Sequence, residues 1–299
     1  MKTSLLLTIT LIISSFGISQ VTLVPDLNFE QRLISYGYDS GVPDGMVLTS
    51  NIDTVDSLYL ISAGINDLTG IEDFASLEYL SCSDNNLSTL DLSQCSALSF
   101  ISCDQNQLSN LDIGNLLNLE YLICTRNNLT NLYTTTNPSL RVLQCFENYI
   151  ITLDLTQNDE LEILFCSVNE LTELDLSQNA QLSSALVNSN QLSCLNIKNG
   201  NNTSISSFSA YDNSSLSCIE VDNQTYSTLN WTFIDSMAAF SSSCSNNCSS
   251  LVGLVENIFQ DRSLVKITDL LGRTIENRPN VLLIYYYSDG SFEKKVRFE

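Results

Sequence analysis

Five cysteines recur at intervals of 21 residues in the middle of the chain. They are Cys82, Cys103, Cys124, Cys145 and Cys166. Thiolates coordinate metal ions and form disulfides, so a regular file of cysteines could serve either chemistry. Five thiols in single file cannot surround one tetrahedral ion. The Cβ atoms of cysteines on adjacent strands lie farther apart than the ~3.8 Å that a disulfide favours. We therefore interpret them as small hydrophobic side chains of a narrow core, with metal binding or disulfides as the alternatives.

Asparagine recurs three residues after each of these cysteines, once more at the same interval, and a last time 23 residues further on. This file comprises Asn85, Asn106, Asn127, Asn148, Asn169, Asn190 and Asn213. A buried amide must be hydrogen-bonded, and an Asn at each bend can bond the backbone of its own turn and of the next one. We expect a structural role for the whole file.

An acidic file follows the same period and comprises Asp91, Asp112, Asp154 and Asp175, with Tyr133 in place of one member. Calcium would require carboxylate oxygens that converge on one point, and like charges one strand apart repel each other. We expect a solvated or turn-bonding surface here, with calcium binding as the alternative.

All three files are positions within one repeated phrase, L-x-x-L-x-C-x-x-N-x-L-x-x-L-D-L. Its apolar positions 4 and 6 alternate with other residues, which is the period of a β-strand. Less regular copies cover residues 55–68 and 205–221. The regular copies begin 21 residues apart, at Leu77, Leu98, Leu119, Leu140, Leu161 and Leu182.

The phrase resembles the leucine-rich repeat, with Cys in its third apolar position. The resemblance covers residues 55–221 and implies a β-rich solenoid, wound as a right-handed superhelix with a parallel concave sheet. Each turn buries its apolar side only against its neighbours. Because 21 residues leave little room for a full helix, we expect extended or 3₁₀ segments on the convex side.

Both ends of such an array need caps, which cover its exposed core. In the N-terminal cap, residues 20–54, we expect Asp26 to begin a short helix with Phe29, Leu33 and Ile34 on its apolar face. This stretch resembles the N-terminal cap of Bacteroidetes-type leucine-rich-repeat surface proteins. In the C-terminal cap, residues 222–250, we expect aromatic side chains to cover the last turn. These are Tyr226, Trp231, Phe233 and Phe240.

Four further cysteines, Cys194, Cys218, Cys244 and Cys248, lie near the C-terminal cap. Four cysteines allow three pairings, and the sequence alone does not choose among them. We favour a disulfide between Cys218 and Cys244, which would join the cap to the final repeat. Cys95 then remains as a lone thiol.

Both ends of the chain carry features of export. Residues 1–19 combine one Lys, an apolar run and small residues before Gln20, which predicts a secretory signal peptide and a protein that is secreted or on the outer cell surface. Residues 251–299 are predicted to form short strands joined by turns.

This tail resembles the C-terminal sorting domain of type IX secretion substrates in residues 268–273, 284–287, 289–290 and 294–295. The resemblance implies recognition by an outer-membrane secretion machinery. An ordinary β-rich terminal subdomain is the alternative.

Charge and composition limit the partners and the chemistry. The chain has 12 basic and 34 acidic residues and no His, and residues 20–250 hold only four of the basic ones. So acidic a chain does not neutralise phosphates, which excludes nucleic acid as a partner. We find no further apolar run of membrane-spanning length, no phosphate-binding loop and no nucleophile beside a base. We therefore expect no enzyme, catalytic site, metal or cofactor.

The strand side of a leucine-rich repeat is its concave face, and here that face is rich in apolar and aromatic residues. Exposed patches of this kind usually mark binding sites, although strand propensity favours the same residues. We expect Arg126 to lie there as the lone cation. The candidate ligand-binding residues are Tyr79, Phe100, Tyr121, Ile123, Arg126, Phe146 and Phe165.

The sequence thus predicts a monomeric binding or adhesion protein for a protein or glycan ligand. The first alternative is a structural protein of the cell envelope without a discrete ligand. An enzyme is the other alternative.

Overall fold

The computed structural model describes residues 20–245, 248, 264–268, 282–287 and 292–296. The chain divides into two compact units, Met1–Cys248 and Ser249–Glu299. The first is called the main unit and the second the tail unit. The predicted signal peptide, residues 1–19, lies outside the described residues.

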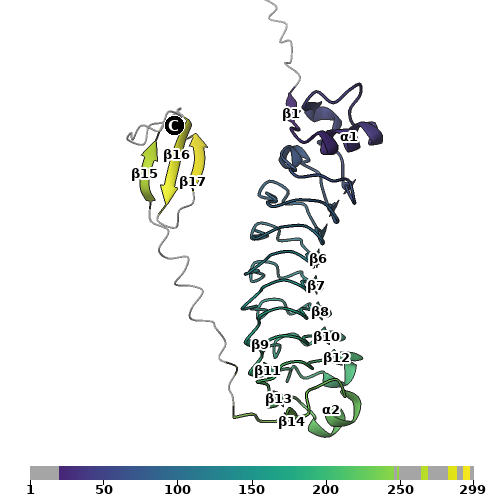
Figure 1. Ribbon diagram of the computed structural model, residues 1–299, viewed down its shortest axis with the longest axis vertical. Helices are drawn as coiled ribbons and strands as arrows, with labels where there is room; N and C mark the ends of the chain where they lie inside the picture. Colours follow the sequence, from purple (N-terminus) through teal and green to yellow (C-terminus); the bar gives the residue numbers. More distant parts are fainter. Residues whose placement is uncertain (1–19, 246–247, 249–263, 269–281, 288–291, 297–299) are drawn as a thin grey trace, which may run out of the picture. The chain divides into compact units, whose positions relative to one another are not determined.

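The main unit is a parallel β-solenoid, in which short strands from successive turns lie side by side (Figure 1). Paired residues of adjacent strands, such as Tyr79, Phe100 and Tyr121, follow one another at intervals of 21 residues. This confirms the predicted repeat and its parallel sheet. In the part of the chain that is described, the strands of this sheet are β3 (Ser57–Tyr59), β4 (Tyr79–Ser81), β5 (Phe100–Ser102), β6 (Tyr121–Ile123), β7 (Val142–Gln144), β8 (Ile163–Phe165), β10 (Ser184–Leu186) and β12 (Ser207–Ser209).

The return path of each turn is extended or 3₁₀-helical, as the 21-residue length predicts. Among the described residues, the 3₁₀ helices of the return path are η2 (Ile71–Asp73) and η3 (Asn202–Ser204), and a third, η1 (Thr49–Asn51), lies in the N-terminal cap. In the later turns the return path goes further than predicted and pairs as a second parallel sheet. Its strands are β9 (Glu173–Asp175), β11 (Cys194–Asn196), β13 (Cys218–Glu220) and β14 (Ala239–Ser241).

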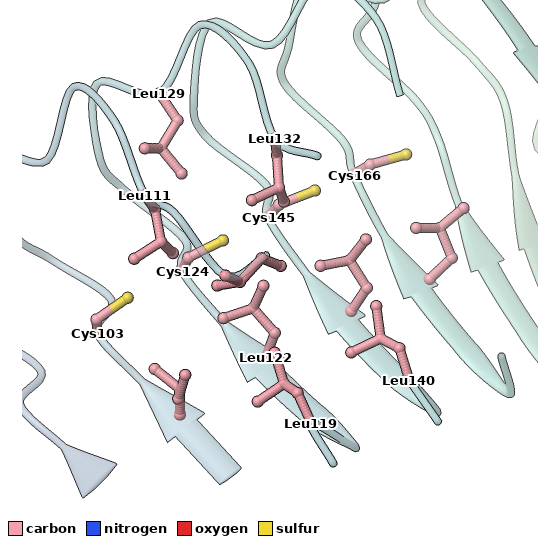
Figure 2. Close-up of a cluster of buried hydrophobic side chains, with 14 of the residues drawn as sticks. Cys103, Leu111, Leu119, Leu122, Cys124, Leu129, Leu132, Leu140, Cys145 and Cys166 are labelled. Carbon is pink, nitrogen blue, oxygen red and sulfur yellow. The ribbon is translucent and has the colours of Figure 1, made fainter. Parts of the chain in front are cut away.

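The five periodic cysteines line the core, and each is a fully buried free thiol. Figure 2 shows four of them in file beside the core leucines. Burial raises the pKa of Cys82 and Cys145 to about 12. Burial, together with neighbouring thiols, also raises the pKa of Cys103, Cys124 and Cys166 well above the ordinary value. These thiols therefore behave as the small hydrophobic side chains that their spacing predicts.

The Asn file has the structural role that the sequence predicts, and Asn127 shows how. Its Nδ2 donates to the carbonyl oxygens of Cys124 in its own turn, at 3.2 Å, and of Cys103 in the preceding turn, at 3.0 Å. Its Oδ1 accepts from the amide of Leu108, also in the preceding turn, at 3.0 Å. The neighbouring turn that each Asn bonds is thus the preceding turn, and not the next turn as the sequence predicts. Every Asn of the file bonds in this same direction along the solenoid.

A second Asn file lies on the return path and is absent from the sequence-based prediction. Asn137, Asn158 and Asn179 are fully buried and 21 residues apart. Asn158 donates to two carbonyl oxygens of the preceding turn at 3.0 and 2.8 Å. The lone thiol Cys95 occupies the same position in an earlier turn, and its Sγ lies 3.5 Å from the carbonyl oxygen of Ile71. Cys95 therefore stands where later turns use Asn.

Each Asp of the acidic file accepts a hydrogen bond in a local bend of the main chain, which is the turn-bonding role expected for it. In each case Oδ1 accepts from the main-chain amide two residues further on, at 2.9 to 3.0 Å. These bonds fix the bend that begins the return path. The residues are Asp91, Asp112, Asp154 and Asp175.

The N-terminal cap contains the helix α1 (Leu27–Tyr36) and the ribbon of β1 (Val21–Leu23) and β2 (Met46–Leu48). Asp26 caps α1 by accepting from the amides of Asn28 and Phe29, and it also accepts from the amide of Asn66 in the first repeat. Burial opposes ionisation of Asp26, but these donors outweigh it and lower the pKa of the carboxyl.

The apolar face of α1 is narrower than predicted. Phe29 and Leu33 are buried, whereas Ile34 is only half-buried. Glu30 is buried beside them, because its carboxylate accepts from the amides of Asp44 and Gly45.

In the C-terminal cap, α2 (Gln224–Asn230) leads into Trp231, which is buried. Its ring centroid lies 4.4 Å from that of Phe208 in the last strand of the large sheet, 5.8 Å from Phe240 and 6.3 Å from Tyr226. The prediction is wrong for Phe233, which is 66% exposed because its main chain, and not its ring, bonds the last turn through Ala210.

Two disulfides close this end of the solenoid. One joins Cys218 to Cys244, the pair that the sequence favours, and the other joins Cys194 to Cys248. Together they attach the chain beyond α2 to two turns of the return-path sheet, since Cys194 begins β11 and Cys218 begins β13.

The tail unit holds a three-stranded antiparallel sheet of β15 (Leu264–Thr268), β16 (Leu282–Tyr287) and β17 (Phe292–Val296). These strands lie where the sequence predicts them. The expected turns at Leu271-Gly272-Arg273 and Ser288-Asp289-Gly290 lie outside the described residues.

The buried thiols make stability sensitive to alkaline pH. A thiol whose pKa is raised on folding stabilises the fold fully below its unfolded value near 9, and this contribution is lost as pH rises toward the folded value. Each thiol should cost about 1.4 kcal/mol of unfolding free energy per pH unit above 9. Thermal unfolding between pH 8 and 10.5 measures the loss. Replacing Cys103 and Cys124 with Ala should make the loss less steep, and an unchanged slope would contradict this account.

Candidate ligand-binding face

The outer side chains of the large sheet form three rows, which together are called the concave face. The first row holds the first residue of each strand, the second row holds the third residue, and the third row holds the second residue after the strand. The middle residue of each strand, such as Leu80 or Leu122, points into the core. Register between strands keeps each row aligned along the solenoid.

Four aromatic rings stack along one end of this face and are called the aromatic stack. They belong to Tyr59, Tyr79, Phe100 and Tyr121. Successive ring centroids are 5.0, 4.1 and 5.9 Å apart, and Tyr79 and Phe100 are nearly parallel at 8°. Tyr79, Phe100 and Tyr121 are equivalent residues of paired strands, which lie about 4.8 Å apart and suit aromatic contact. Tyr59 belongs to the second row, in register with Ser81, and its ring reaches that of Tyr79 from there. Burial and the nearby Tyr59 raise the pKa of Tyr79.

Arg141 ends the aromatic stack. Its guanidinium carbon lies 5.9 Å from the ring centroid of Tyr121, and Nη1 lies 3.2 Å from the Tyr121 hydroxyl. Arg141 also pairs with Glu162 at 2.7 Å and with Glu120 at 3.6 Å. The arrangement holds the Tyr121 ring between Phe100 and a cation.

The expectation that Arg126 is the lone cation of this face is therefore wrong. Arg126 pairs with Glu147 at 3.1 Å, and Arg141 is a second cation beside the aromatic stack. Sequence reasoning missed Arg141 because it immediately precedes β7 and so lies outside the positions expected to face the ligand. The available signal was its place between Glu120 and Glu162, which occupy the same position of the adjacent repeats.

The other predicted residues lie on the same face but in other rows. Ile123 and Phe165 belong to the second row, with Gln144 between them in register. Phe146 belongs to the third row, after β7. All three side chains are half-buried. Of the predicted set, only Tyr79, Phe100 and Tyr121 are in ring contact with one another within the described residues.

A polar cluster borders the aromatic stack in the second and third rows. The hydroxyls of Ser83 and Ser102 lie 2.8 Å apart, and both donate to the carboxylate of Asp104. Both serines are buried. The cluster fixes these side chains next to the rings and gives the face a rigid polar margin.

In the large sheet, from β4 onward, the third residue after each strand is left-handed and turns the chain into the bend that carries Asn. Positive φ angles of 53° to 56° occur at Arg126, Glu147 and Val168, among others. Such residues are usually Gly, Asn or Asp. The backbone therefore holds these exposed side chains in fixed positions at the edge of the concave face.

Truncation of the aromatic stack should destabilise the protein through lost ring contacts. Phe100→Ala removes contacts on both sides and should cost about 1–3 kcal/mol of unfolding free energy. Leu122→Ala in the core should cost about 2–5 kcal/mol. Ile163→Ala, in the same row beyond the stack, is the control, with an expected cost of about 1 kcal/mol or less. Urea unfolding measures all three, and an equal cost for Phe100→Ala and Ile163→Ala would show that the rings do not support one another.

Comparison with family models finds no match, and comparison with curated protein sequences finds none either. Solved structures do match. Internalin C2 of Listeria monocytogenes aligns with a TM-score of 0.58 at 18% identity, over 75% of this chain and 99% of that one. The functional domain of InlJ from the same species, described as including a cysteine ladder, aligns with a TM-score of 0.43 at 27% identity.

That alignment covers 69% of this chain and 58% of the InlJ domain. A leucine-rich-repeat protein of Leptospira interrogans aligns with a TM-score of 0.46 at 20% identity, over 68% of this chain and 52% of that one. The chain thus spans little more than half the length of these two proteins. The alignment with internalin C2 agrees with the 21-residue repeat and the parallel sheet: the main unit has the fold of a leucine-rich-repeat β-solenoid.

Proposed function

We propose that this chain is an exported binding protein whose concave face recognises a protein ligand. The aromatic stack is the observation that carries the proposal. Four aromatic side chains lie on a rigid sheet, and Tyr59 is 48% exposed. Aromatic residues and Arg concentrate in the centres of protein interfaces, and aromatic side chains offer large contact areas with few rotatable bonds.

The geometry of the rings favours a protein over a glycan. A sugar ring packs its apolar face on the open face of an aromatic ring. Tyr79 and Phe100 each have a ring on both sides, and Tyr121 lies between Phe100 and Arg141. The stack therefore presents ring edges and hydroxyl groups, which suit the side chains and backbone of a protein.

The two disulfides support export as well. Two disulfides join the C-terminal cap to the repeats, and disulfides form in oxidising compartments outside the cytoplasm. Within the described residues, no helix is long and apolar enough to cross a membrane. We propose that residues 1–19 direct export and that residues 251–299 direct type IX secretion to the medium or the cell surface.

Binding on the concave face can be tested once a ligand has been captured from the natural surroundings of the producing cell. Tyr79→Ala and Phe165→Ala should each weaken binding by about 2 kcal/mol, or thirtyfold, as expected for a central interface residue. Tyr149→Ala is the matched control, because Tyr149 is exposed but lies past the bend that ends β7. Calorimetry measures affinity, and circular dichroism checks folding.

Two outcomes would contradict the proposal. If only Tyr149→Ala weakens binding, the ligand uses another surface. If no saturable ligand is found on protein or glycan arrays, the alternative of a structural envelope protein is favoured.

The tail can be tested separately in the producing cell. Deletion of residues 251–299 should leave the main unit folded but trapped in the periplasm, because only the tail would be recognised by the outer-membrane machinery. Cell fractionation with an antibody against the main unit measures the distribution. Equal amounts at the surface or in the medium, with and without the tail, would refute a sorting role.

A further inference from the structure

Carboxylates border the aromatic stack on two sides. On one side, the carboxylates stand at the residue that immediately precedes a strand. On the other side, they stand at the left-handed residue that follows a strand, or at the residue before that left-handed one. Arg141, which occupies the first of these positions, reaches the hydroxyl of Tyr121, so this row lies along the edge of the stack. In the turns that hold the stack, these carboxylates are Asp56, Glu78 and Glu120 on the first side and Asp84 and Asp104 on the second; Glu162, Glu147 and Asp212 occupy the same positions in later turns.

The cations among these residues are already neutralised. Arg141 pairs with Glu162 and Glu120, and Arg126 pairs with Glu147. The carboxylates at these positions outnumber the cations. Within the described residues, no cation pairs with Asp56 or Glu78. Both of these side chains are exposed.

Asp56 immediately precedes β3, the strand that ends with Tyr59. Glu78 immediately precedes β4, the strand that begins with Tyr79. Paired strands place the two carboxylates about one strand spacing apart, so their charges repel each other. Exposed ring edges and unneutralised negative charge thus meet on the side of the concave face where the first strands begin. Arg32 of α1 lies past the other end of β3, where it donates to the carbonyl oxygen of Ile61 at 3.2 Å. An anionic ligand would add to the repulsion, whereas a cationic one would relieve it.

We propose that the concave face binds a basic segment of its protein partner, in which Lys or Arg side chains flank apolar ones. The apolar side chains lie against the edges of Tyr59 and Tyr79, and the cations lie against Asp56 and Glu78. This inference rests on the proposed function and specifies the chemistry of the partner. The excess of acidic residues in residues 20–250 would also speed the approach of such a partner at low salt.

The test uses the mature chain, residues 20–299, and random peptides displayed on phage as the probe. Peptides that bind should be enriched in Lys and Arg next to aromatic or aliphatic residues. A synthetic peptide of the enriched sequence is then measured at about 0.15 M salt, where distant charges are screened.

The decisive comparison is between two double variants that each remove two negative charges. Asp56→Asn with Glu78→Gln should weaken binding of the peptide roughly tenfold, because both carboxylates would contact it. Asp159→Asn with Glu160→Gln should change it by less than about twofold, because these exposed residues lie on the return path. Tyr79→Ala, measured in parallel, reports whether the peptide uses the concave face at all.

The outcomes separate this inference from the proposed function. Neutral or acidic peptides that lose binding in Tyr79→Ala would overturn the basic partner but support the concave face. Equal weakening by the two double variants would also overturn it, because the attraction would then be general. Peptides that are insensitive to both Tyr79→Ala and the Asp56/Glu78 variant would overturn the inference and the proposed function together.

Discussion

The structure depends on the hydrogen bonds that join each turn of the solenoid to the one before it. A turn of 21 residues cannot bury its own apolar side, so it is stable only against its neighbours. At the bend, polar backbone groups come close to the core and need partners there. The Asn side chains provide them, and Asn127, for example, bonds carbonyl and amide groups in two successive turns. The same Asn side chain therefore joins successive turns and pairs the backbone polar groups that lie close to the core.

This bonding fixes the register of the strands, and register determines what the surface can present. Equivalent residues of successive turns lie directly beside one another, in the core and on the concave face alike. In the core, that arrangement suits a small side chain such as Cys, which fills a narrow file without strain. On the surface, it brings Tyr79 and Phe100 within 4.1 Å, and each ring then restricts the movement of the next. A rigid aromatic surface costs little conformational entropy when a ligand binds.

The same regularity creates an electrostatic cost. Carboxylates at equivalent positions repel across the strand spacing, and the structure relieves this where it can with Arg141, which lies between Glu120 and Glu162. Where the equivalent position holds no cation, as at Asp56 and Glu78, the repulsion is left to solvent, to salt or to a partner. In the proposed function, a surface that is apolar at its centre and acidic at its margins would select its partners more by charge than by area.

The repeat, the parallel sheet, the buried Cys and Asn files and the two caps could all be derived from the sequence. The repeat, the sheet and the two files follow from local periodicity, since a side chain that recurs at one place in a strand or bend must point the same way in every turn. The caps follow instead from the need to cover the exposed core at both ends of the array. The second Asn file could have been found in the same way, from the equal spacing of Asn137, Asn158 and Asn179.

Other features depend on contacts that periodicity does not contain. The position of Arg141 over Tyr121 depends on the rotamers of long side chains in two turns. The exposure of the Phe233 ring and the pairing of Cys194 with Cys248 depend on the path of an irregular cap. Repetition in the sequence therefore determined the solenoid and the direction of its side chains. Only the tertiary structure decided which side chains meet, because those contacts arise between residues that are distant in the chain and adjacent only in the fold.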